Sequence, residues 1–182
     1  MKTRLRTSKL NTNLAQRITY RFARNLVQMS RNQTITLISN DDLRGKIGVS
    51  IHFGPWELIG KAMINAGYRF GIITRRYDGE IHHLIRRFRK GSGITTFYAD
   101  ELVKIRDFLK KGGTIGMMVD GKNIESRMAQ ARRLSQAFKA PIIKGALIPV
   151  NGTFYLSTNN IDFTELVLRY PEHYAWFYLT HN

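Results

Sequence analysis

The pair of side chains best suited to acid–base chemistry lies in residues 50–60, which read SIHFGPWELIG. His52 ends an apolar run, and Glu57 follows five positions later, after Gly54 and Pro55 have made a turn. Pro55 suits the first position of a helix, so Glu57 should lie in the first helical turn, within reach of the imidazole. A carboxylate on one ring nitrogen fixes the tautomer and lets the other nitrogen remove a hydroxyl proton. The spacing therefore permits His52 to act as a general base oriented by Glu57, and a histidine that only caps or packs is the alternative for this pattern.

Further polar side chains follow two other apolar runs. Arg75 and Arg76 come directly after residues 70–74, and a guanidinium group there can bind the phosphate of an anionic head group in a bidentate manner. Ordinary surface charge is the alternative for these two arginines. Asp120 ends the run 115–119, where it orients an arginine or a substrate hydroxyl, or caps the next turn.

The elements that must position these residues alternate along the chain. Runs rich in β-branched and aromatic residues occur at 34–39, 47–51, 70–74, 94–98, 114–119 and 141–150, and helical patterns occur at 56–66, 80–90, 100–111 and 125–139. This βαβα order predicts a single α/β domain with a mostly parallel central sheet and helices on both faces. Ligands of such sheets bind beyond the carboxyl ends of the strands, which is where His52, Arg75 and Asp120 fall.

The C-terminal part of the sequence departs from this alternation. Asn151-Gly152 lies between two apolar runs and predicts a tight hairpin, so a late strand of the sheet should be antiparallel. A helix-like stretch over 163–179 follows, interrupted at residues 170–172. His173 and Trp176 should share a face of that helix, where packing or an interfacial aromatic anchor is a better expectation than catalysis.

The composition is that of a folded protein with an unusual charge. Hydrophobic residues make up 43% of the 182 residues, whereas 29 Lys and Arg against 13 Asp and Glu leave a net charge of +16. Such a field attracts polyanions and anionic membrane surfaces. The sequence has no cysteine, which excludes disulfides and cysteine-ligated metals, and His82 and His83, adjacent on a helix, should point in different directions. We expect neither a metal nor a cofactor.

The first 32 residues form a basic amphipathic segment ahead of the α/β domain, which we assign to residues 33–182. Leu14, Ile18, Phe22 and Leu26 recur every four positions, with arginines on the other side. Such a helix can lie in a lipid interface, or it can pack its apolar face on the domain core. The pattern does not separate these alternatives.

The residues around His52 resemble a known family. HFGPWEL resembles the first signature block of the lipid A late acyltransferases, the lauroyl/myristoyl transferases of lipopolysaccharide biosynthesis, which belong to the glycerolipid acyltransferase superfamily with its His-x-x-x-x-Asp/Glu motif. Residues 72–76 with the basic helix that follows are similar to the second block, 109–120 to the third, 140–150 to the strand segment beyond, and 170–177 to the closing block. The blocks occur in the same order from about residue 34 to the C-terminus.

This resemblance implies transfer of a fatty acyl chain from a thioester carrier to a hydroxyl of a lipid A precursor or related phospholipid. His52 would remove the hydroxyl proton, Glu57 would orient it, and a backbone N–H near Gly54 or Arg76 would stabilise the oxyanion. The implied partners are acyl carrier protein or acyl-CoA, an anionic lipid acceptor and the membrane surface. The implied location is the cytoplasmic face of the inner membrane, as a peripheral protein.

The sequence also departs from the family. The hydrophobic anchor that usually begins these proteins is replaced by the basic segment, and the aromatic element expected after Asp120 is missing. A catalytically inactive, membrane-surface member of the fold is therefore one alternative. A basic nucleic-acid-binding domain is another, since clustered arginines give the same electrostatic footprint. The sequence contains no nucleic-acid-binding motif, so we do not expect nucleic acid as a partner.

Overall fold

The computed structural model describes residues 35–76, 80–120 and 124–175, together with five residues nearer the N-terminus. These five are Gln16, Arg17, Tyr20, Arg24 and Val27; all are in helical conformation and exposed. The rest of the expected amphipathic segment lies outside the described residues, as does Trp176.

The central sheet has five strands, all parallel, in the order β4-β3-β5-β2-β6. The strands are β2 (Ile47–Ser50), β3 (Phe70–Thr74), β4 (Thr95–Tyr98), β5 (Thr114–Met118) and β6 (Ile142–Lys144). Because parallel strands end at the same edge, the loops after β2, β3 and β5 all emerge on one side of the sheet. The predicted α/β class and parallel sheet are confirmed.

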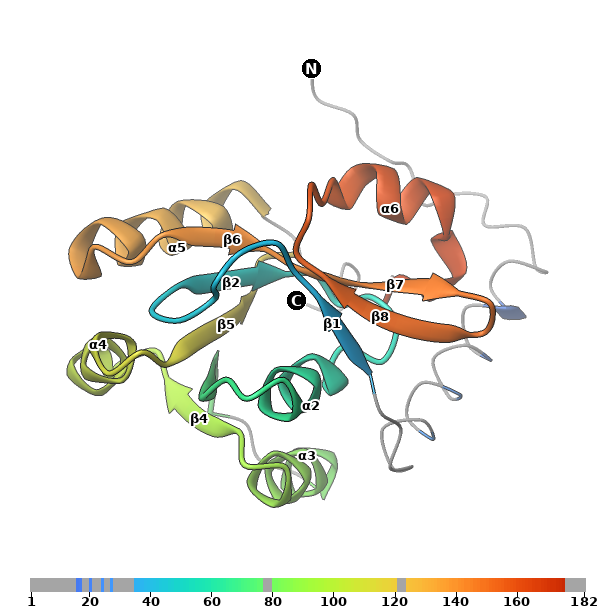
Figure 1. The fold of residues 1–182 in the computed structure, drawn as a ribbon. Helices are drawn as coiled ribbons and strands as arrows, with labels where there is room; N and C mark the ends of the chain where they lie inside the picture. Colours follow the sequence, from blue (N-terminus) through green and yellow to red (C-terminus); the bar gives the residue numbers. More distant parts are fainter. Residues whose placement is uncertain are drawn as a thin grey trace.

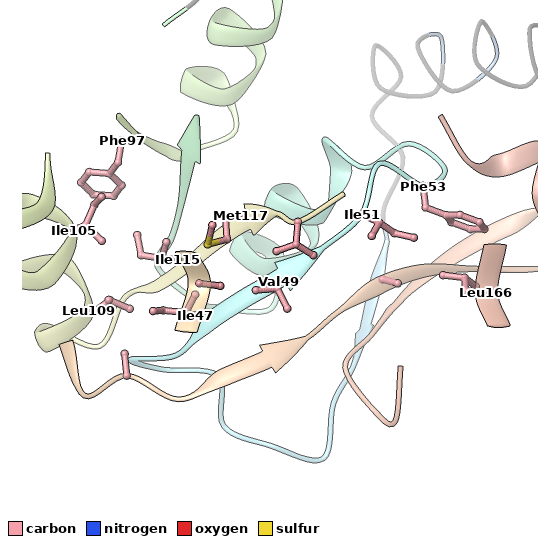
Figure 2. Packing of buried hydrophobic residues seen from close by; sticks show 14 of the residues in the cluster. Ile47, Val49, Ile51, Phe53, Phe97, Ile105, Leu109, Ile115, Met117 and Leu166 are labelled. Carbon is pink, nitrogen blue, oxygen red and sulfur yellow. The ribbon is translucent and has the colours of Figure 1, made fainter. Parts of the chain in front are cut away.

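Helices cover both faces of this sheet (Figure 1). On one face, α4 (Leu102–Lys110) and α5 (Ile124–Phe138) pack on a row of strand residues that includes Ile47, Val49 and Ile115, shown in Figure 2. On the other face, α2 (Leu58–Asn65) and α3 (Glu80–Gly91) pack on a second cluster built around Phe70. The alternation of side chains along each strand supplies both clusters.

A second, three-stranded sheet lies beside the first, in the order β1-β8-β7. It consists of β1 (Thr36–Ile38), β7 (Ala146–Val150) and β8 (Thr153–Ser157). The predicted hairpin at Asn151-Gly152 is confirmed: β7 and β8 are antiparallel, and both turn residues have positive φ, as this tight turn requires. The run 141–150 is nevertheless two strands, divided at Gly145, so the antiparallel pair belongs to this second sheet and not to the central one.

The chain after the hairpin forms α6 (Phe163–Arg169) and a 3₁₀ turn, η1 (Pro171–His173). Asp162 caps α6 by accepting hydrogen bonds from the amides of Thr164 and Glu165. Pro171 cannot continue the helix, and Tyr174 is already extended. The interruption predicted at residues 170–172 is confirmed, whereas the helix predicted to resume after it is wrong at residues 174–175, where the chain is not helical.

Candidate active site

His52 and Asp120 meet because of the register between two neighbouring strands. Strands β2 and β5 are parallel, and their register pairs Ser50 with Met118. Two residues further along each chain come His52 and Asp120, at the carboxyl edge of the sheet. The two side chains that follow these central strands therefore face each other where an α/β sheet normally binds its ligand.

Asp120 holds His52 through two hydrogen bonds. Its Oδ1 lies 2.7 Å from the imidazole Nδ1, and its Oδ2 accepts the backbone N–H of His52 at 2.8 Å. The Asp120 side chain is fully buried, whereas the His52 side chain keeps 18% of its surface exposed. Because a carboxylate can only accept, Nδ1 carries the hydrogen and Nε2 is the basic nitrogen of this tautomer. The arrangement suits a general base oriented by a buried acid.

The backbone around His52 is fixed by its neighbours. Ile51 and Phe53 are both buried in the core, as Figure 2 shows, so the chain is anchored on each side of the histidine. The Trp56 ring meets the imidazole edge to face at 5.2 Å between centroids. Packing of this kind restricts the ring to one orientation, which a general base requires.

Tyr174 makes a further contact with Asp120. Burial raises the pKa of the Tyr174 hydroxyl, and the negative charge of Asp120 and a hydrogen bond to that carboxylate raise it further. The phenol therefore stays protonated and can donate. The sequence shows no acid–base motif at Tyr174 and predicts a helix there. The contact of Tyr174 with Asp120 is therefore not predicted from the sequence.

Glu57 does not fill the position predicted for it. Its carboxylate forms a bidentate ion pair with Arg89 of α3, with Arg89 Nε donating to Oε2 at 2.8 Å. Both side chains are largely buried, at 8% and 11% exposed. The carboxylate on His52 Nδ1 is that of Asp120, because the strand register places it there, while Glu57 at the start of α2 pairs with the arginine of the neighbouring helix. Glu57 thus ties α3 to the turn after His52.

Asp120 likewise has a role that the sequence interpretation did not include. The sequence predicts an arginine partner, a substrate hydroxyl or a turn cap for Asp120, and the structure shows the His52 imidazole and amide instead. The sequence feature that could have identified Asp120 is its position. Asp120 lies two residues after the end of β5, just as His52 lies two residues after the end of β2. Using this feature requires knowing that β2 pairs with β5, and local sequence patterns do not show which distant strands pair.

Arg75 and Arg76 lie beyond the end of β3, as predicted, on the far side of β5 from His52. Two strand spacings separate β3 from β2, or about 10 Å. The Arg76 guanidinium stacks 3.9 Å from the Tyr98 ring centroid and pairs with Asp100 at 3.1 Å. The hydrogen bond from Arg76 lowers the pKa of Asp100. Both arginines are exposed, but the Arg76 guanidinium is engaged with Asp100 and Tyr98, so Arg75 is better placed to meet an anionic group.

Gly54 has a structural part in the turn. Its φ of 58° lies in the left-handed region, and its N–H donates to the carbonyl of His173 at 2.8 Å. That amide is therefore already used and does not serve as the oxyanion donor in this conformation, which leaves other backbone N–H groups near Gly54 or Arg76 as the expected donors.

Of the remaining histidines, the structure describes the side chains of His83 and His173. His83 is exposed, with the Arg86 guanidinium 3.2 Å from its ring, and the His82 side chain lies outside the described residues. His173 is buried among aromatic rings, 5.7 Å from Phe53 and 5.4 Å from Phe154. Among the residues that the structure describes, no group of three or more His, Asp or Glu side chains could hold a metal ion.

No protein-family model matches the sequence, and no curated protein matches it. The geometry of the site and the sequence motifs of this chain are therefore the features that bear on its function. Within its described part, the structure contains no helix long and apolar enough to cross a membrane.

Proposed function

We propose that the protein is an O-acyltransferase in which His52 is the general base and Asp120 the carboxylate that orients it. The observation that carries this proposal is the 2.7 Å contact between His52 Nδ1 and the fully buried Asp120 carboxylate at the carboxyl edge of the sheet. A buried carboxylate on Nδ1 stabilises the imidazolium that forms when Nε2 takes a proton. Positioned bases of this kind typically contribute about 10²–10⁴-fold to a rate.

The reaction follows from this chemistry. An acceptor hydroxyl gives its proton to His52 Nε2 while its oxygen attacks the carbonyl carbon of an acyl thioester. The tetrahedral intermediate then expels the thiolate, which takes the proton back from the imidazolium. The products are an ester and a free thiol, and His52 returns to its neutral form.

The substrates are proposed from the resemblance of residues 52–58 and the later blocks to the lipid A late acyltransferases. The donor is an acyl chain on acyl carrier protein or coenzyme A, and the acceptor is a hydroxyl of a lipid A precursor or related anionic phospholipid. The net charge of +16 supports both, because acidic carriers and anionic lipids are attracted to it. Arg75, exposed at the same edge, is proposed to bind the acceptor's phosphate.

The place of action is proposed on the same grounds. An anionic acceptor lipid is met at the cytoplasmic face of the inner membrane, where a basic peripheral protein is attracted to the surface. Glu57 enters this proposal as a positioning residue, since its partner is Arg89 and not the imidazole.

Acyl transfer tests the proposal directly. The protein is incubated with radiolabelled acyl carrier protein, or acyl-CoA, and a lipid A precursor in anionic vesicles, beside a His52→Ala variant with an unchanged circular dichroism spectrum. The proposal predicts labelled lipid with the unsubstituted protein and at least a hundredfold less with His52→Ala. Equal labelling by both proteins removes His52 from the reaction. Strongly salt-dependent binding to duplex DNA or RNA without labelled lipid would instead favour a nucleic-acid-binding domain.

A further inference from the structure

We propose that Tyr174 is a positioning residue for the His52–Asp120 pair, and that the C-terminal segment 173–175 completes the site. The catalytic part of this inference rests on the proposed function, whereas the positioning part concerns the imidazole itself and can be measured without a substrate.

The first observation is a backbone clamp around His52. The Gly54 N–H donates to the His173 carbonyl at 2.8 Å, and the Ala175 N–H donates to the His52 carbonyl at 2.9 Å. Between these bonds, Phe53 and Tyr174 form an antiparallel bridge. Residues 173–175 therefore act as a one-bridge strand partner for residues 52–54, more than 100 positions earlier in the chain. This pairing fixes the backbone on both sides of the imidazole.

The second observation is the set of donors on the Asp120 carboxylate. It receives the His52 Nδ1–H, the His52 backbone N–H and the Tyr174 hydroxyl. The carboxylate is fully buried, so each donor replaces water that the charge has lost. Tyr174 is the donor that does not belong to His52, so it holds the acid independently of the group that the acid must orient.

The phenol is a constant donor rather than a switch. Tyr174 is buried, and both its burial and the Asp120 charge favour the protonated phenol. At any pH at which the protein is folded and His52 can act as a base, the hydroxyl is present. Removal of the Tyr174 hydroxyl should therefore leave more of the negative charge of Asp120 to interact with the His52 Nδ1–H.

Other groups around the site do not account for such a change. Glu57 and Arg89 are paired with each other. His173 packs its ring on Phe53 and Phe154, and Trp56, which faces the imidazole, carries no charge. A change in the titration midpoint of His52 on loss of the Tyr174 hydroxyl can therefore be assigned to the lost hydrogen bond on Asp120.

The decisive experiment compares Tyr174→Phe with Tyr170→Phe, a half-buried tyrosine four residues earlier that serves as the matched control. The pH titration of His52 is followed by the ¹⁵N shifts of its ring in the full chain. Loss of the Tyr174 donor concentrates negative charge on Asp120 and favours the imidazolium, so the titration midpoint rises by at least about half a pH unit. Tyr170→Phe leaves it in place. An equal midpoint in Tyr174→Phe and the unsubstituted protein overturns the inference.

Activity separates this inference from the proposed function. In an active protein, Tyr174→Phe lowers kcat about tenfold with KM within twofold, the effect of one lost hydrogen bond to a charged group. If the midpoint moves but no preparation transfers acyl groups, the proposed function fails and the positioning inference stands. If the protein is active and neither kcat nor the midpoint changes, the positioning inference fails alone.

A measurement on the unsubstituted protein covers the case in which Tyr174→Phe does not fold. The clamp predicts that the Gly54 and Ala175 amides exchange with solvent slowly and at similar rates, because they belong to one bridge. Rapid exchange of both amides in the folded protein would overturn the inference.

Discussion

Arg89 and Glu57 form a buried bidentate ion pair that ties helix α3 to the turn carrying His52. The cost of removing two charges from water makes such a pair a weak source of net stability, but removing one partner leaves the other charge buried alone. We therefore predict that Arg89→Met lowers the free energy of unfolding by about 3–5 kcal/mol.

Urea unfolding checks this prediction, with Arg87→Met on the exposed side of the same helix as the control. The double variant Glu57→Leu with Arg89→Met should recover most of the loss, because no unpaired charge remains. A single variant as stable as the control would show that the pair does not hold α3.

Gly54 should be intolerant of a side chain for two separable reasons. Its φ is 58°, and an added Cβ would lie 2.8 Å from the Phe154 ring. Gly67 has a φ of 84° with nothing within 4 Å of the added Cβ, so Gly67→Ala isolates the backbone strain, about 1–2 kcal/mol. Overpacking makes Gly54→Ala about 1–3 kcal/mol worse than Gly67→Ala in unfolding experiments. An equal loss of unfolding free energy in the two variants would mean that the Phe154 ring moves away from the added Cβ at no cost in free energy.

Tyr174 should make the protein lose stability in alkali. Its folded pKa is raised above the ordinary value of about 10 by burial and by Asp120, so its contribution is fully present below pH 10. As the pH rises further, the unfolded chain releases the phenol proton first, and the free energy of unfolding falls. We predict that Tyr174→Phe reduces this fall by about 1 kcal/mol per pH unit between pH 10 and 11. Identical slopes for the two proteins would place Tyr174 in contact with solvent.

The sequence allowed most of the fold to be predicted, because its signals are local. The strand at 70–74 and the helix from residue 80 follow from periodicity and from Gly and Pro at element ends. The division at Gly145 was missed because β6 and β7 form one continuous β-rich run, and only their different partners, β2 and β8, separate them. The interruption after α6 follows from Pro171, whereas the extended backbone at Tyr174 was missed because apolar residues continue past Pro171.

The candidate site was predicted in part. His52 follows from its place after an apolar strand, and its position at the sheet edge agrees with that prediction. The choice of Glu57 as its partner relied on nearness in sequence, whereas the partner in space comes from the register of β2 with β5. Tyr174 could not be identified because its contact with Asp120 depends on a bridge between distant segments.

The assignment of Asp120, rather than Glu57, as the carboxylate of the general base can be decided by comparing kcat for acyl transfer in Asp120→Asn and Glu57→Gln. The exchange of acid for amide keeps the shape of each side chain and removes its charge. In Asp120→Asn the amide imposes the wrong tautomer on His52, and kcat should fall about 10³–10⁴-fold with KM little changed. Glu57→Gln should lower kcat less than tenfold, since its effect passes through Arg89. A large loss in Glu57→Gln with nearly full activity in Asp120→Asn would contradict the mechanism proposed for this site.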